Sequence, residues 1–197
     1  MERNGGYARG RATRQVVLAE ALRLFGEVGY RSATLRELAA RCGLSHPGLL
    51  HHFPSKAALL QAVLEERDVV EGARAGAVGA TGVAHLRALL RIARASAAAP
   101  GLVELFAVLS AEAGAPDHPA HDFFVRRYAR LRAELTTAFR EAAEDGLLRP
   151  GVDPVSAAVL LTACWDGLQV QWLHDRDSVD VAAGLEAALR LLVDLDG

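Results

Sequence analysis

The side chains best suited to chemistry in this sequence recur at helical spacing between positions 45 and 52. His46, Gly48, Leu50 and His51 share the outer face of a short predicted helix. Histidine can donate or accept hydrogen bonds at base edges, and leucine can pack against a thymine methyl group. A glycine in this set would let the backbone approach a groove closely. This face therefore indicates readout of DNA in the major groove.

The elements that would present this face are two short helices joined by a tight turn. Thr34 followed by Glu37 forms a capping box, which predicts the start of the first helix. Gly43 would end that helix, and Ser45 would cap the second helix, with Pro47 in its first turn. Helices connected by so short a turn cross at a steep angle, so the sequence predicts a helix-turn-helix.

Three runs of residues in and around this motif follow a specific order and spacing. They are A-L-R-L-F-x-x-x-G-Y at 21–30, T-L-R-E-L-A-A-R-C-G-L-S at 34–45 and L-L-H-H-F-P-S-K-A-A-L-L at 49–60. Residues 14–64, which contain these runs, resemble the DNA-binding domain of the TetR family of bacterial repressors. A further run, W-D-G-L-Q-V-Q-W-L at 165–173, resembles the C-terminal helix of the subgroup that includes the betaine-type repressors.

The motif and the resemblance together give the candidates for DNA contact. Leu50 departs from the family pattern, which usually has a phosphate-contacting tyrosine there, and His52 replaces a residue that is often aromatic. Lys56, at the start of the next predicted helix, is implied as a phosphate contact, since helix N-termini attract anions. The candidates are Thr34, Arg36, Ser45, His46, Pro47, Gly48, Leu50, His51, His52 and Lys56.

Helical periodicity continues along the chain and predicts an all-α protein. Residues 1–12, rich in Gly and Arg, are predicted to be a flexible basic arm. Residues 13–58 are predicted to form a three-helix helix-turn-helix domain, and residues 59–197 a helical bundle for ligand binding and dimerisation. The glycines of residues 72–82 mark the clearest break in the pattern. Later helices are predicted over 83–99, 102–113, 154–174 and 178–195, with a long helix capped by Asp117 and running to about 145.

Charge is distributed unevenly along the chain. Residues 1–56 hold nine basic and four acidic residues, whereas the remainder holds thirteen basic and twenty acidic residues. A basic head suits phosphate binding, and an acidic body does not. The N-terminus has no apolar signal core, the apolar run at 157–165 is too short to cross a bilayer, and Cys42 and Cys164 have no pairing or metal spacing. These features indicate a cytoplasmic protein without a membrane partner.

The resemblance implies a pocket for an unidentified small-molecule effector in the C-terminal domain. The aromatic and polar candidates for this pocket are Phe106, Phe124, Tyr128, Trp165 and Gln169, and core packing or a dimer interface is the alternative for each. Asp166, next to Trp165, hints at a cationic or hydroxylated ligand. The last two helices carry more apolar surface than a single subunit of this size can bury. This predicts a homodimer in which they form a four-helix bundle with their copies. Such a dimer would read a near-palindromic operator in double-stranded DNA.

Motifs for catalysis are missing from the sequence. It contains no Gly-rich phosphate loop, no G-x-S-x-G and no H-E-x-x-H, so neither an enzyme nor a cofactor is predicted. His118 and His121 lack a third histidine or a cysteine in an obvious position, so no metal site is predicted. The sequence thus favours a ligand-responsive repressor that leaves its operator when a small molecule binds. The alternative is a small-molecule or metal-binding helical protein, with or without enzymatic activity, whose helix-turn-helix is vestigial, as Leu50 and His52 would allow.

Overall fold

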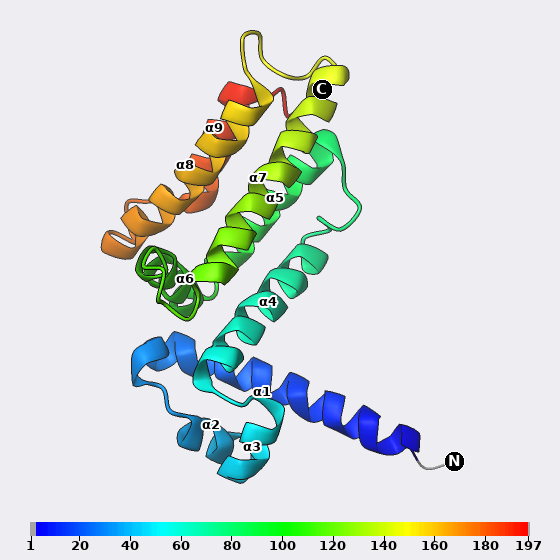
Figure 1. The fold of residues 1–197 in the computed structure, drawn as a ribbon. Coiled ribbons are helices and arrows are strands. Elements are labelled where there is room, and N and C mark those ends of the chain that lie inside the picture. The colour runs from blue at the N-terminus through cyan, green and yellow to red at the C-terminus, as the bar shows by residue number, and fades with distance from the viewer. Residues whose placement is uncertain (1–2, 197) are drawn as a thin grey trace.

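The computed structural model describes residues 3–196, and this range is all-α, as predicted. It contains nine helices: α1 (Arg3–Ser32), α2 (Leu35–Arg41), α3 (His46–His52), α4 (Lys56–Arg74), α5 (Gly82–Ser96), α6 (Pro100–Glu112), α7 (His121–Glu144), α8 (Pro154–His174) and α9 (Val181–Leu192). Figure 1 shows α1, α2 and α3 at one end and the bundle of α5, α7, α8 and α9 at the other, with α4 between them. Within the described range, no single helix is long and apolar enough to span a membrane, although the bent pair α5 and α6 meets the length and composition criteria together.

The helix-turn-helix forms through the local caps that the sequence predicts. The Thr34 hydroxyl accepts a hydrogen bond from the Glu37 amide at 3.1 Å, and the Ser45 hydroxyl accepts one from the Gly48 amide at 3.2 Å. Gly43 lies between the two helices with a φ of +65°. These caps satisfy backbone donors that helices of only seven residues would otherwise leave free. Short helices therefore start and stop at defined positions and can present a fixed face.

The first helix is longer than predicted, and the flexible arm at residues 1–12 is wrong for the part that the structure describes. Helix α1 begins at Arg3, while positions 1 and 2 lie outside the described residues. A glycine in a helix costs only about 1 kcal/mol relative to alanine, and no proline interrupts residues 3–32. The helix therefore continues back through this segment and projects from the body (Figure 1). Gly29, with φ 76° and ψ 159°, breaks the helical conformation inside α1.

The C-terminal helices form a bundle with its own core. Buried residues of α5, α7, α8 and α9 pack into one cluster, among them Leu86, Phe139, Leu161 and Leu189. Asp153 is the N-cap of α8, and its Oδ2 accepts a hydrogen bond from the Ser156 amide at 2.8 Å. These long helices hold the walls of the cavity described below.

Two predicted helix starts in this region are wrong. Helix α7 begins at His121 after Ala120, not after Asp117, because Pro119 disfavours helical conformation at His118. The His118 ring instead closes a turn, in which its Nδ1 accepts a hydrogen bond from the Ala120 amide at 3.2 Å. Helix α9 starts at Val181 rather than near 178, since Asp180 caps it by accepting from the Ala183 amide.

The division of the chain into two cores does not follow the predicted boundary at residues 58 and 59, which falls inside the continuous helix α4. One cluster joins buried residues of α1 to α4 with Phe106, Leu109, Phe123 and Phe124 of α6 and α7. The helix-turn-helix end therefore shares apolar packing with two helices of the C-terminal region. Packing of this kind is able to pass a displacement of α6 or α7 to α1 and α4.

Helix α6 also meets α1 at a close backbone contact. A Cβ atom added to Gly101 would overlap the carbonyl oxygen of Gly26, and one added to Gly26 would lie 3.3 Å from Leu102 Cδ2. Side chains at these two positions would therefore force the helices apart. The pair of glycines sets how closely α1 lies against α6.

Gly101→Ala is expected to destabilise the protein by about 2 kcal/mol, because the added methyl group meets rigid backbone. Urea unfolding followed by circular dichroism measures this change. The control is Gly72→Ala in the interior of α4, where an added Cβ meets no atom within 4 Å and alanine improves helix propensity. Equal stability of the two variants would contradict the close contact.

Candidate DNA interface and ligand cavity

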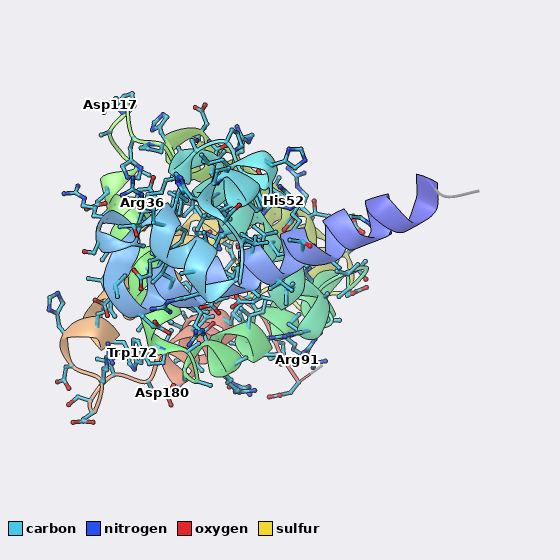
Figure 2. The ribbon with its side chains drawn as sticks, turned by 90° about the horizontal axis from the view of Figure 1, so that it is seen from below. Arg36, His52, Arg91, Asp117, Trp172 and Asp180 are labelled. Carbon is cyan, nitrogen blue, oxygen red and sulfur yellow. The ribbon has the colours of Figure 1, made fainter. Side chains whose placement is uncertain are left out.

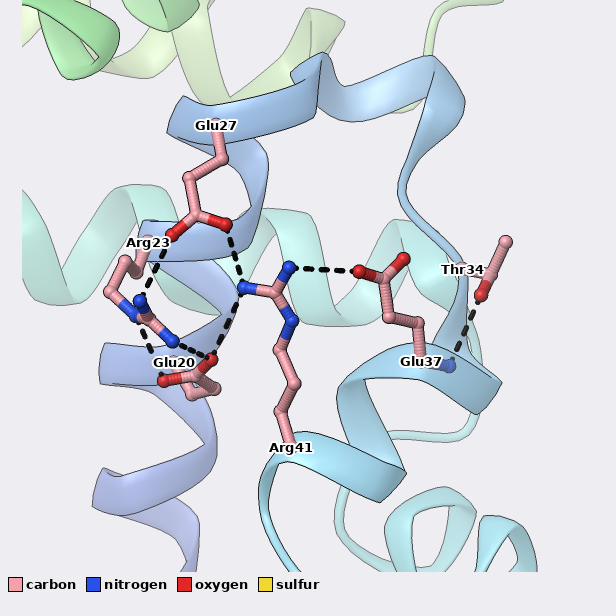
Figure 3. Close-up of polar contacts among 6 residues, drawn as sticks. All are labelled: Glu20, Arg23, Glu27, Thr34, Glu37 and Arg41. Atoms are coloured by element: carbon pink, nitrogen blue, oxygen red, sulfur yellow. Dashed lines mark hydrogen bonds and ion pairs between the residues drawn. The ribbon is translucent and has the colours of Figure 1, made fainter.

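Charged side chains fasten the helix-turn-helix to α1 (Figure 3). Arg41 of α2 contacts Glu27 Oε2 at 2.7 Å and Glu37 Oε1 at 2.9 Å, and Arg23 contacts Glu20 at 2.7 Å. The hydrogen bond that Arg41 donates to Glu27 raises the pKa of Arg41 above its usual range. Each exposed pair contributes little on its own, but the network fixes the orientation of α2 against α1.

The predicted DNA-binding residues gather at the end of the molecule formed by α2 and α3, which faces the viewer in Figure 2. Leu49 and Phe53 are fully buried and turn one side of α3 into the core. Arg36 and His51 are exposed, and His46, Leu50 and His52 are half-buried. Thr34, Ser45 and Pro47 are also exposed, and Gly48 and Lys56 are half-buried.

Three of the predicted contacts are engaged within the protein, namely Thr34, Ser45 and Lys56. The Lys56 ammonium donates a hydrogen bond to the Arg31 carbonyl at 3.0 Å and lies 4.5 Å from the centre of the Tyr30 ring. Partial burial lowers the pKa of Lys56. The hydroxyl of Ser45 already accepts from the backbone. An ammonium group has three donors, so Lys56 can still donate to a phosphate while it keeps its bond to Arg31.

Arg14 is a residue at this end that was not among the predicted contacts. It donates a hydrogen bond to the His52 carbonyl at 3.1 Å and stacks 4.2 Å from the centre of the Phe53 ring. These contacts hold the C-terminal end of α3 against α1. The sequence gives no local signal for this pairing, because the partners are 38 positions apart.

The predicted ligand residues all line one cavity of about 150 Å³ between α4, α5, α6, α7 and α8. Phe106, Phe124, Tyr128, Trp165 and Gln169 come from three of these helices. The Phe106 and Phe124 rings pack edge to face, with their centroids 6.3 Å apart. The structure thus brings together side chains that are distant in sequence, in a partly open and mostly apolar site.

Charged residues of α4 that were not predicted also line this cavity. Asp68 accepts hydrogen bonds from Arg127 Nε at 2.9 Å and from Arg130 Nη2 at 3.0 Å, which ties α4 to α7. Arg67 pairs with Glu71 at 2.8 Å, and its guanidinium lies 3.9 Å from the centre of the Phe106 ring. The helical spacing of Arg67 and Glu71 was readable in the sequence, but their position in the cavity was not.

A second hydrogen-bonded pair connects α7 to α8 across the cavity wall. The Tyr128 hydroxyl donates to Asp166 Oδ2 at 2.8 Å. Burial raises the pKa of Tyr128 to about 12, with a further contribution from Asp166, and burial also raises the pKa of Asp166 above its usual range. Folding therefore works against the carboxylate form of Asp166.

Asp166→Asn is expected to be more stable than the natural protein at pH 7 and equal to it below about pH 4. A carboxyl whose pKa rises on folding stabilises most below its unfolded pKa and loses that contribution as the pH rises through the folded pKa. Asparagine has no such titration, and its amide oxygen can still accept from Tyr128. Urea midpoints at both pH values check this, and a variant that is less stable at pH 7 would contradict the burial argument.

A larger cavity of about 360 Å³ adjoins the first and shares Trp165 and Gln169 with it. Trp172 and Asp180 line this second cavity and lie near each other in Figure 2. The Arg176 guanidinium covers the Trp172 ring at 4.9 Å from its centre. Trp165 therefore lines both cavities.

His118 and His121 contact their neighbours near the turn between α6 and α7. His118 Nε2 lies 3.8 Å from Glu112, and His121 Nδ1 lies 2.8 Å from the Ala113 carbonyl. Over residues 3–196 no group of three or more His, Cys, Asp or Glu side chains is arranged to hold a metal ion. These histidines instead fasten the turn between α6 and α7.

Comparisons with known proteins cover both parts of the chain. A family model described as bacterial regulatory proteins of the tetR family matches residues 17–63. A model described as the C-terminal part of BetI-type transcriptional repressors matches residues 86–197, more than half of the chain. The HTH-type transcriptional repressor Rv1474c of Mycobacterium tuberculosis is 30% identical over 179 residues, which span 89% of this chain and 90% of that protein.

Other known proteins match a shorter stretch of the sequence or have a similar solved structure. The class C tetracycline repressor protein of Escherichia coli is 44% identical over 52 residues, which are 26% of this chain and 24% of that repressor's length. A solved structure described as the molecular basis for control of antibiotic production by bacterial hormones is 27% identical, with a TM-score of 0.74 over 92% of this chain and 98% of that one. These matches do not favour a vestigial helix-turn-helix on a binding protein of another class. The chain belongs to the TetR family of bacterial transcriptional regulators, with a C-terminal domain of the BetI type.

Proposed function

We propose that this protein is a non-enzymatic, cytoplasmic repressor that binds its operator as a homodimer and releases it when a small molecule occupies the cavity of about 150 Å³. One observation carries the proposal. Helix α4, which follows the predicted recognition helix α3 directly, also supplies Arg67, Asp68 and Glu71 to the wall of that cavity. A ligand that moves α4 therefore moves the DNA-binding end.

The DNA-binding part of the proposal rests on the exposed face of α2 and α3. His51 is exposed, and half-buried His46 and Leu50 lie on the same short helix, whose opposite face is fixed by Leu49. A helix held in this way can enter the major groove, where base edges carry a distinct pattern of donors and acceptors. Thr34 and Arg36, at the start of α2, would contact the sugar–phosphate backbone of the DNA, together with Lys56.

The dimer part of the proposal rests on apolar side chains exposed on the last two helices. Val159, Leu160 and Val170 of α8 are 49%, 60% and 47% exposed, and Leu191 of α9 is 78% exposed. Pairing α8 and α9 with their copies would cover these side chains in a four-helix bundle. Two recognition helices would then address half-sites about one helical turn apart, roughly 34 Å.

The mechanism is a free-energy coupling between the cavity and the DNA-binding end. A ligand that binds one arrangement of α4, α6 and α7 more tightly than the other shifts the dimer toward that arrangement. Coupling of about 1–3 kcal/mol changes operator affinity about 5- to 150-fold, which is sufficient to release a promoter. The shared core of α1, α4, α6 and α7 provides a contiguous path for this shift.

The experiment that tests the proposal is selection of the purified protein against random duplex DNA, followed by a screen for small molecules that release the selected sequence. A near-palindrome with half-sites about one helical turn apart supports the dimeric repressor. Its affinity should fall steeply with salt, because phosphate contacts release counterions. Failure to retain any sequence motif at low salt, with or without small molecules, would overturn the proposal.

His51→Ala is expected to weaken operator binding by about 1–3 kcal/mol and to relax sequence preference, because an exposed ring on α3 reads base edges. Lys56→Ala should weaken binding to all sequences alike and make the salt dependence shallower, since a phosphate contact carries no sequence information. Fluorescence anisotropy with the selected operator and with a scrambled duplex separates the two effects. A uniform loss from His51→Ala would remove this residue from base readout.

A further inference from the structure

Three buried side-chain atoms lack a hydrogen-bond partner among the described residues, and all three belong to side chains that line the same cavity. They are Arg67 Nε, His85 Nε2 and Trp165 Nε1. No other buried side-chain nitrogen or oxygen in the described part of the chain is in this condition. Buried polar groups in proteins are nearly always hydrogen-bonded, because an unpaired group has lost its bonds to water without gaining others. Their concentration in one cavity marks a site built to receive polar atoms.

The chemistry of these atoms restricts what they can bind. The Nε atom of arginine and the indole nitrogen of tryptophan are donors only, and neither can accept a hydrogen bond. Arg67 is 7% exposed and is fixed in place by Glu71 at 2.8 Å and by the Phe106 ring at 3.9 Å. Its unpartnered Nε–H cannot turn elsewhere without breaking those contacts. The cavity therefore requires hydrogen-bond acceptors from its occupant.

Charge around the cavity argues against an ionic occupant. Its lining carries Arg67, Arg127 and Arg130 together with Asp68, Glu71, Glu134 and Asp166. The arginines are already matched with Asp68, Glu71 and Glu134, so an anion would add an unmatched charge beside those carboxylates. A cation without an acceptor atom would leave the Arg67 and Trp165 donors unpaired, and Asp166 already accepts from Tyr128. A neutral molecule satisfies the donors without adding an unpaired charge.

We propose that the effector is a small neutral molecule whose carbonyl-type oxygen accepts hydrogen bonds from Arg67 and Trp165, while an apolar ring-sized body lies against Phe106 and Phe124. This inference rests on the proposed function, since it assigns a chemical class to the effector of that site. A volume of about 150 Å³ suits such a body, because cavities of that size admit benzene. His85, whose ring nitrogen donates or accepts according to its tautomer, completes the polar end.

The test uses four molecules of nearly the same shape with the purified dimer and no DNA. Acetophenone carries a neutral carbonyl, benzoate is its anionic analogue, benzamidinium its cationic analogue, and cumene has no acceptor. Binding is followed by ¹H–¹⁵N spectra of the indole groups, of which the chain has two, at Trp165 and Trp172. Acetophenone is expected to bind about 5- to 30-fold tighter than cumene and to move the Trp165 indole resonance downfield.

Two tryptophan variants test which side chain gives the preference for acetophenone over cumene. Trp165→Phe keeps an aromatic ring but deletes the donor, and should reduce the preference for acetophenone over cumene by about 3-fold or more. Trp172→Phe assigns the two resonances and should leave the preference unchanged, because Trp172 lines only the second of the two cavities. Tighter binding of benzoate or benzamidinium, no binding of acetophenone at millimolar concentration, or a preference that survives Trp165→Phe would each overturn the inference.

The result is separable from the proposed function. If a palindromic operator is selected and some other compound releases it, while acetophenone binds no better than cumene, the assignment of the effector class fails and the repressor stands. If acetophenone shows the stated preference but no duplex is ever retained, the chemistry of the cavity stands and the repressor fails. The spectra on the natural protein decide the matter even if one of the tryptophan variants does not fold.

Discussion

Leu160→Glu is expected to convert the protein from a dimer into a monomer and to reduce operator affinity by about 100-fold or more. Leu160 lies on α8 with 60% of its surface exposed, next to Val159 at 49%. In a four-helix bundle this side chain would be buried, and a carboxylate there would be desolvated without a partner. A monomer presents one recognition helix and loses the gain from two linked contacts, which is typically 10²- to 10⁴-fold.

The matched control places the same charge on another exposed valine. Val125 lies on α7 with 54% of its surface exposed, outside the two helices proposed for dimerisation. Val125→Glu should remain a dimer and should bind the operator as the natural protein does. Sedimentation velocity gives the oligomeric state, and anisotropy gives the affinity. If both variants stay dimeric, the interface does not lie on this face of α8.

Features encoded over a few residues were predictable from the sequence. The caps by Thr34, Ser45 and Asp153 each use a hydrogen bond between positions three apart, so the residue types alone announce them. The same local logic misled at residues 3–12. Glycines there suggested a flexible arm, but the helix that follows extends through them. Helix continuation outweighed a propensity penalty of about 1 kcal/mol per glycine.

Features that depend on tertiary contact were beyond local patterns. The Asp68 carboxylate meets Arg127 and Arg130 at separations of 59 and 62 residues, and nothing in the sequence near Asp68 specifies either partner. The aromatic ligand candidates were found because large apolar rings are few and gather in the second half of the chain. Arg67 and His85 were missed, because a charged or polar residue on a helix is usually solvated, and only the fold turns these two inward.

Asp68→Asn is expected to destabilise the protein by about 3 kcal/mol and to weaken the response of operator binding to the effector. Asp68 is 14% exposed and is the only acceptor that the described residues offer to both Arg127 and Arg130. Removing the Asp68 carboxylate leaves Arg127, which is 22% exposed, without a carboxylate partner among the described residues, whereas Arg130 keeps Glu134. A partly buried charge that has lost its partner destabilises the fold. Asparagine preserves the shape of the side chain, so the loss reports on the charge.

The consequence for regulation follows from where Asp68 lies. It joins α4, which leads to the DNA-binding end, to α7, which carries Phe124 and Tyr128 of the cavity. Without the ion pair between Asp68 and Arg127, a ligand that displaces α7 no longer displaces α4. The ligand should then change operator affinity by less than about 5-fold, which corresponds to a coupling free energy of about 1 kcal/mol. The control is Glu134→Gln, which removes a carboxylate that is 48% exposed and 3.8 Å from Arg130 and should change stability by less than about 1 kcal/mol. Urea unfolding and operator anisotropy with and without a releasing compound measure both quantities, and an effect of Asp68→Asn as small as that of Glu134→Gln would exclude this joint from the mechanism.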